Sequence, residues 1–181
     1  KITYTLKEHD LDVCWEVVNK DSETMYFTIG GHPAFRVPVR EGESQSDYRL
    51  AFEEQDALTY LLIDTSVGTV IADEPHTLPL ENGTCAIDPH MFDKDALVFD
   101  NGQIQKAGIL FPDGSPYLTL TSEGFPNFGI WSVPGAPFVC LEPWMGRCDD
   151  CGFEKPLSEK ANINVLKPDE EFIRSYQITV H

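Results

Sequence analysis

The chain has 181 residues and a hydrophobic content of 41%, which is enough for one globular domain with a substantial core. Thirteen Lys and Arg residues against thirty Asp and Glu residues give a formal net charge of −17. Such a surface repels phosphate backbones and anionic lipid headgroups, so we expect neither nucleic acid nor a membrane as a partner.

The first strands are expected at residues 1–6, 11–18 and 24–29. In the first of them Ile2, Tyr4 and Leu6 alternate with polar residues, which is typical of a half-buried strand. Short polar turns separate the three segments, and this pattern predicts an antiparallel meander.

The rest of the chain continues as short apolar segments separated by Gly and Pro residues. Strands are predicted at 48–52, 58–63, 69–72, 77–80, 96–99, 104–111, 117–121, 128–133, 138–142, 163–166 and 171–180. Residues 88–95 are compatible with one short helical turn that delivers Asp95 to the next strand. The pattern predicts an all-β fold, a large antiparallel β-sandwich formed by residues 1–181 as a single domain.

Residues 146–162 form the longest stretch without periodicity, and we expect a loop at the rim of the site. Within it, Asp149 and Asp150 are expected to be solvated rather than to bind a cation. The pair Cys148 and Cys151 is a lone CxxC, so we expect no metal site and no cofactor there. Five cysteines in a chain with a normal core favour reduced thiols and a cytoplasmic location.

A candidate functional histidine lies in a short loop after the third predicted strand. Gly30 and Gly31 permit a sharp turn or a close approach to a ligand, and Pro33 favours an extended backbone at His32. The imidazole is thereby held in a defined pose beside Phe35. A loop histidine fixed by a local hydrogen bond is the structural alternative.

A candidate carboxylate lies far along the chain, where Glu142 ends an apolar strand. Pro143 lacks an N–H group, so strand pairing is expected to stop there. Trp144 supplies a flat apolar face of the kind that stacks on sugar rings. Partly apolar surroundings raise the pKa of a carboxyl group, which suits a general base near neutral pH. An edge-strand glutamate in a surface ion pair is the alternative.

Together these segments resemble the aldose 1-epimerase (galactose mutarotase-like) family. The matching segments follow one order along nearly the whole chain: 31–35 (GHPAF), 92–97 (FDKDAL), 120–126 (LTSEGFP), 141–144 (LEPW) and 166–172 (LKPDEEF). The GHPAF and EPW forms look like the bacterial branch of the family. The resemblance implies the family's β-supersandwich fold and a small-molecule sugar as substrate.

The resemblance also implies roles for three residues. His32 matches the general acid that protonates the ring oxygen, and Glu142 matches the general base that takes the proton of the anomeric hydroxyl. Asp95 matches the family aspartate that hydrogen-bonds sugar hydroxyls. Trp144 and Phe35 are our own stacking candidates. An imidazole and a carboxylate can carry out this chemistry near neutral pH without a cofactor.

Members of the family carry an earlier β-rich segment with an arginine and a further histidine, and this sequence begins after it. We therefore expect the C-terminal portion of such a domain, with a sandwich incomplete at its N-terminus. We expect its unpaired sheet edges to pair either with strands of that N-terminal segment or with strands of another chain.

Two other functions are compatible with the same residues. One is a carbohydrate-binding protein on the same scaffold without turnover, because fold does not fix function. The other is a glycoside hydrolase with two carboxylates, which ranks last because the best partner for Glu142 is a histidine.

Overall fold

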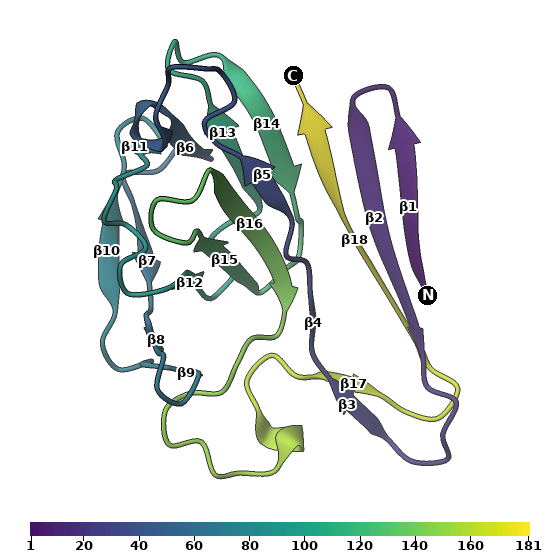
Figure 1. Ribbon diagram of the computed structural model, residues 1–181. Coiled ribbons are helices and arrows are strands. Elements are labelled where there is room, and N and C mark those ends of the chain that lie inside the picture. The colour runs from purple at the N-terminus through teal and green to yellow at the C-terminus, as the bar shows by residue number, and fades with distance from the viewer.

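The computed structural model describes residues 1–181, and its regular secondary structure is almost entirely antiparallel strands (Figure 1). The larger sheet has the order β1 (Ile2–Lys7), β2 (Asp10–Val18), β18 (Glu171–Val180), β14 (Pro116–Thr121), β13 (Lys106–Leu110), β6 (Arg49–Phe52) and β11 (Thr84–Ala86). The second sheet has the order β12 (Leu97–Phe99), β15 (Asn127–Trp131), β16 (Phe138–Met145) and β4 (Ile29–Gly30), with β5 (Ala34–Arg36) also paired to β16.

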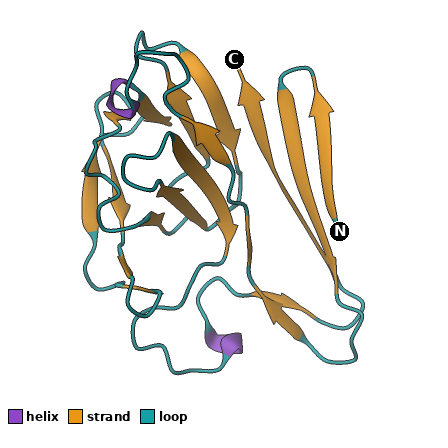
Figure 2. Ribbon diagram, viewed as in Figure 1, coloured by secondary structure: helices purple, strands orange, loops and turns teal.

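Three two-stranded ribbons complete the fold. They are β10 (His76–Pro79) with β7 (Ala57–Tyr60), β17 (Asn164–Leu166) with β3 (Met25–Phe27), and β8 (Ile63–Asp64) with β9 (Thr69–Val70). Helix is confined to two short 3₁₀ turns, η1 (Gln45–Asp47) and η2 (Leu157–Glu159) (Figure 2). No helix of the structure has the length and apolar character needed to cross a bilayer. The predicted all-β sandwich is confirmed.

The core lies between the two main sheets and joins 24 buried residues. Trp15 on β2 and Tyr176 on β18 contribute from the larger sheet, while Phe128 on β15 and Leu141 on β16 contribute from the second. Side chains alternate between the faces of a strand. Because Leu141 faces the core, its neighbour Glu142 points to the other face of the second sheet, and that face carries the candidate site.

The N-terminal strands differ from the sequence prediction in two ways. First, β1 and β2 do form an antiparallel hairpin, but β2 then pairs with β18, and β3 pairs with β17 instead of continuing a meander. These partners are distant in sequence, so short turns gave no sign of them. Second, β1 is not half-buried: Ile2, Tyr4 and Leu6 are 53%, 67% and 75% exposed.

Two smaller segments also depart from the predicted elements. The predicted strand over residues 58–63 is interrupted, since β7 ends at Tyr60 and β8 begins at Ile63. Residues 88–95 form successive reverse turns rather than a helix, with backbone hydrogen bonds from Met91 to Asp88, from Asp93 to His90 and from Asp95 to Phe92. Asp95 still lies directly before β12, as expected.

Candidate active site

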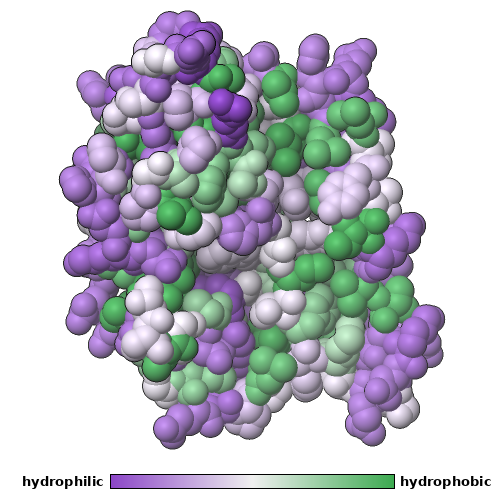
Figure 3. Space-filling model, viewed as in Figure 1, coloured by the Kyte–Doolittle hydropathy of each residue, from purple (hydrophilic) through white to green (hydrophobic).

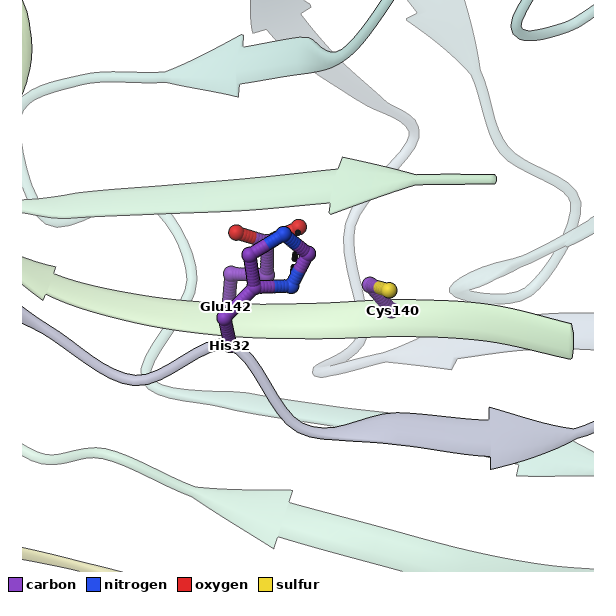
Figure 4. Close-up of side chains that lie close together, drawn as sticks. All are labelled: His32, Cys140 and Glu142. Atoms are coloured by element: carbon purple, nitrogen blue, oxygen red, sulfur yellow. Dashed lines mark ion pairs between the residues drawn. The ribbon is translucent and has the colours of Figure 1, made fainter. Parts of the chain in front are cut away.

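His32 and Glu142 meet on the outer face of the second sheet (Figure 4). His32 lies in the loop between β4 and β5, and Glu142 lies inside β16. Strand pairing continues past Glu142, with Pro143 opposite Phe128 and Trp144 opposite Asn127, so the expectation that pairing stops at Pro143 is wrong. Two backbone hydrogen bonds fasten this loop to β16 on either side of Glu142: Gly31 N–H donates to the Pro143 carbonyl at 2.9 Å, and Leu141 N–H donates to the Pro33 carbonyl at 3.3 Å. The His32 Nδ1 and Glu142 Oε1 atoms are 3.3 Å apart as a result.

The two partners differ strongly in their access to water. The Glu142 side chain is 6% exposed, whereas the His32 side chain is 60% exposed. The pKa of Glu142 is raised to about 7. Burial is the largest cause, the hydrogen bond from the Trp144 indole opposes it, and the charge of Asp95 adds to the increase. A carboxyl group with this pKa exchanges protons readily at neutral pH, which is what a general base requires.

Trp144 lies beside Glu142 on the same face of β16. Its indole ring covers the backbone of the strands on both sides, β4 and β15, at positions where each has a glycine. A Cβ atom on Gly30 would lie 2.5 Å from Cδ1 of Trp144, and one on Gly129 would lie 2.3 Å from its Cζ2. Neither distance is possible without displacing the ring, so the two glycines allow the indole to lie flat against the sheet. Trp144 therefore lies against the sheet beside Glu142 and packs on the small apolar cluster of Leu61, Val70 and Val98.

A cavity of about 680 Å³ is within the size range of small-molecule sites. Neither His32 nor Glu142 lines it, but its lining includes Trp131, whose ring contacts the His32 imidazole. Asp95 lines it from the turn before β12, and its Oδ1 accepts a hydrogen bond from Ala96 N–H at 2.6 Å. Trp131 lines it from the end of β15, and residues 62–65 form part of the wall around β8. Figure 3 shows a hollow over β15 near the middle of the molecule.

Trp131 connects this cavity to His32 and was not recognised from the sequence. Its ring meets the His32 imidazole edge to face, with centroids 5.8 Å apart and an interplanar angle of 75°. Trp131 also pairs with Cys140 in the β15–β16 register and so shares the face that carries Glu142. The signal in the sequence was weak, because Trp131 lies inside the strand predicted at 128–133, and the structure ends β15 at Trp131.

Phe35 does not lie in the site, which contradicts the stacking role expected for it. It pairs with Val139 on β16 and packs against the hydrophobic core. Since Val139 and Glu142 point to opposite faces of β16, Phe35 is on the wrong face to meet a sugar. Its position close to His32 in sequence suggested a shared site, but the alternation of β5 turns its ring inward.

The loop after β16 is tied to the body of the protein by charges. Arg147 forms a two-pronged contact with Asp100, in which Nε donates to Oδ1 at 2.9 Å and Nη2 donates to Oδ2 at 2.8 Å. Its Nη2 also lies 2.7 Å from Asp150, and Lys160 lies 2.7 Å from Asp149. The two aspartates are thus engaged in ion pairs, contrary to the expectation that they are simply solvated. No residue of this loop lines the cavity of about 680 Å³.

The remaining candidates from the sequence are the two cysteines of the CxxC. Cys148 and Cys151 are free thiols, and the Cys151 thiol lies 3.1 Å from the Thr69 hydroxyl. All five cysteines of the chain are free.

No family model matches the chain. Among curated proteins, it is similar to Protein LacX of Lactococcus lactis subsp. lactis, with 29% identity over 183 residues. The match covers 99% of this chain and 61% of that protein, so the chain spans about three fifths of the length of the curated relatives it matches.

The chain is also similar to solved structures along nearly its whole length. The galactose mutarotase related enzyme from Lactobacillus acidophilus superposes with a TM-score of 0.89 at 28% identity, over 99% of this chain and 60% of that one. A galactose mutarotase-like protein from Lactobacillus casei gives a TM-score of 0.85 at 27% identity, over 99% of this chain and 62% of that one. The resemblance to galactose mutarotase-like proteins is therefore confirmed in both sequence and fold.

Proposed function

We propose that this chain, a relative of galactose mutarotase-like proteins, forms the catalytic part of an aldose 1-epimerase that interconverts the α and β anomers of a free hexose or related aldose. The observation that supports this proposal best is the contact between a buried carboxyl group of pKa about 7, Glu142, and the exposed His32 at 3.3 Å. A general base and a general acid are the two groups that this reaction needs.

In the proposed mechanism, the Glu142 carboxylate takes the proton of the C1 hydroxyl, and His32 in its protonated form gives a proton to the ring oxygen. The bond between C1 and the ring oxygen breaks, and the open aldehyde forms. Rotation about the C1–C2 bond presents the other face of the aldehyde. Reclosure with the two proton transfers reversed gives the other anomer and restores both side chains.

The closeness of the two side chains suits this reaction. The hydroxyl that loses a proton and the ring oxygen that gains one are bonded to the same carbon, so donor and acceptor must converge on one small region. A separation of 3.3 Å between His32 Nδ1 and Glu142 Oε1 meets that requirement after a modest opening around the substrate.

The lining of the adjacent cavity suggests how the sugar is held. The Asp95 carboxylate can accept hydrogen bonds from sugar hydroxyls, and the Trp131 ring offers an apolar face beside His32. We also propose a cytoplasmic location, which the five free cysteines support.

The test follows mutarotation of α-galactose and α-glucose by polarimetry, with Glu142→Gln and His32→Asn as variants. Each variant should lower kcat/KM by roughly 10²–10⁴-fold, the usual contribution of one acid–base group. Lys155→Met, in an exposed ion pair with Glu159, is the matched control and should retain the parental rate. Parental rates in both site variants would remove the assigned roles.

A carbohydrate-binding protein without turnover is the second candidate. It is favoured by the lining of the cavity, which includes Asp95 and Trp131 but neither His32 nor Glu142. Calorimetry separates the two functions: binding of galactose or glucose with anomer exchange at the buffer rate would support binding alone.

A further inference from the structure

The acid–base pair has a third neighbour that mutarotation does not use. The Sγ atom of Cys140, one nitrogen of His32 and one carboxylate oxygen of Glu142 all lie within 4.8 Å of one another. Cys140 precedes Glu142 by two residues on β16, so both side chains point to the same face, and the His32 loop runs alongside β16 (Figure 4).

These three groups are of the ligand types that zinc prefers. Zn²⁺ binds thiolate sulfur, imidazole nitrogen and carboxylate oxygen, and sites with three protein ligands leave a fourth position open. Bonds of roughly 2.0–2.3 Å in a tetrahedron place ligand atoms about 3.3–3.8 Å apart. The His32 and Glu142 atoms already have that spacing at 3.3 Å, so only Cys140 needs to approach, by a side-chain adjustment.

The surroundings also favour a cation. Glu142 is buried, its ion pair is with His32 alone, and the charge of Asp95 acts on it. The chain as a whole has a formal net charge of −17. A divalent ion would offset the repulsion between the two carboxylates, and it would enter from the side of His32, whose side chain is 60% exposed.

We propose that His32, Cys140 and Glu142 form a binding site for Zn²⁺ or a similar thiol-seeking divalent ion, and that occupation of this site inhibits the enzyme. On binding, a sulfur–metal bond forms as the S–H bond of Cys140 breaks, and the proton passes to water. The metal then occupies the electron pairs of His32 and Glu142 that would move protons on the sugar. The inhibitory half rests on the proposed function, whereas metal binding does not.

Binding is tested on the purified protein with Co²⁺ as a spectroscopic probe and Zn²⁺ in calorimetry. Co²⁺ should give a near-ultraviolet sulfur-to-cobalt charge-transfer band, and excess Zn²⁺ should abolish it. Cys140→Ser should remove the band and raise the Kd for Zn²⁺ at least tenfold. The matched control is the double variant Cys148→Ser with Cys151→Ser, which removes both thiols of the CxxC and should keep both signals.

Loss of the band in the control but not in Cys140→Ser would overturn the proposal. Cys140 is 1% exposed, so the serine variant is checked for cooperative unfolding. If it does not fold, Glu142→Gln decides the matter: a Kd unchanged from the parent protein would overturn the site, and a tenfold increase would support it.

Inhibition is measured as the ratio of mutarotation rates with and without Zn²⁺ within each variant. The parent protein and the CxxC control should lose at least tenfold and recover with a chelator, whereas Cys140→Ser should be resistant. An inactive protein that still shows the cobalt band would contradict the proposed function and leave the metal site supported. An active protein that Zn²⁺ does not inhibit would overturn the inhibitory role.

Discussion

Two buried ionisable side chains, Glu142 inside β16 and Arg147 just after its end, have opposite electrostatic surroundings. Arg147 has a side chain that is 8% exposed, and it meets the carboxylates of Asp100 and Asp150 at 2.8 and 2.7 Å. Glu142 is 6% exposed, and its one ion-pair partner is His32, which is largely in water. Burial alone would lower the pKa of Arg147, but its hydrogen bonds to Asp100 and Asp150 raise it, so this residue stays charged.

This difference in hydrogen-bonded compensation distinguishes a charged residue that stabilises the fold from one that is suited to proton transfer. A buried charge with full hydrogen-bonded compensation keeps its ionisation state and holds two segments together. A buried charge with partial compensation is close to losing its charge, which makes it a ready proton acceptor. The four predictions below test this contrast, from the largest expected effect to the smallest.

Removal of the compensated charge should cost the most stability. Arg147→Met leaves the Asp100 carboxylate without a cation, although Asn127 still donates a hydrogen bond to it at 2.7 Å. Breaking such a buried pair typically lowers the free energy of unfolding by about 3–5 kcal/mol. Urea denaturation measures the loss. Lys155→Met, in an exposed pair, should change it by less than about 1 kcal/mol. Similar losses in both variants would show that Arg147 is not a structural anchor.

Removal of the uncompensated charge should instead stabilise the protein. The pKa of Glu142 is about 7 in the folded state against a model value of 4.5, so folding favours the protonated form. The stability that this proton gives is complete below the unfolded pKa and is lost as pH rises through about 7. Glu142→Gln should therefore be more stable than the parent by about 3 kcal/mol near pH 8 and equal to it near pH 4. Denaturation at both pH values measures this, and a destabilised variant at the higher pH would contradict it.

Disturbing the packing of the Trp144 ring on Gly129 should have a smaller effect on stability. In Gly129→Ala, the new Cβ atom would lie 2.3 Å from Trp144 Cζ2 and must displace the indole. Overpacking of this kind costs about 1–3 kcal/mol of unfolding free energy. The same change in a Trp144→Ala background should cost clearly less, since the clash is absent. Equal costs in the two backgrounds would show that the ring does not rest on this glycine.

The smallest effect concerns the indole hydrogen bond. Trp144→Phe removes the N–H donor that lowers the Glu142 pKa, so the carboxyl group should titrate at higher pH. Carbon-detected NMR of the labelled carboxyl group measures the shift without reference to activity. Trp131→Phe, which contacts His32 and is not a donor to Glu142, serves as the control. An unchanged or lower titration midpoint in Trp144→Phe would refute the hydrogen bond's role.

The sequence predicted the local elements of this fold better than their partners. Apolar runs and Gly or Pro residues located most strands because burial and chain reversal impose those patterns locally. The pairing of β3 with β17 and of β2 with β18 depends on contacts between residues far apart in the chain. No local pattern encodes such contacts.

For the site, the structure brings His32, Glu142 and Asp95 into one region, as the resemblance implied. Trp144, our own candidate, lies beside Glu142. Phe35 was misplaced because closeness in sequence is a poor guide on a strand, where neighbours point to opposite faces. Cys140 was missed for the opposite reason. It lies two residues from Glu142 on one strand and so shares its face, a relation that the sequence already contained.

The exposed apolar side of β1 affects how the chain behaves in concentrated solution. An exposed apolar strip on β1, formed by Ile2, Tyr4 and Leu6, favours association between molecules, while a formal net charge of −17 makes them repel one another. Added salt shortens the reach of that repulsion and leaves the apolar attraction intact. The colloidal stability of this acidic chain is therefore greatest in dilute buffer, and light scattering should detect growing clusters as the ionic strength increases.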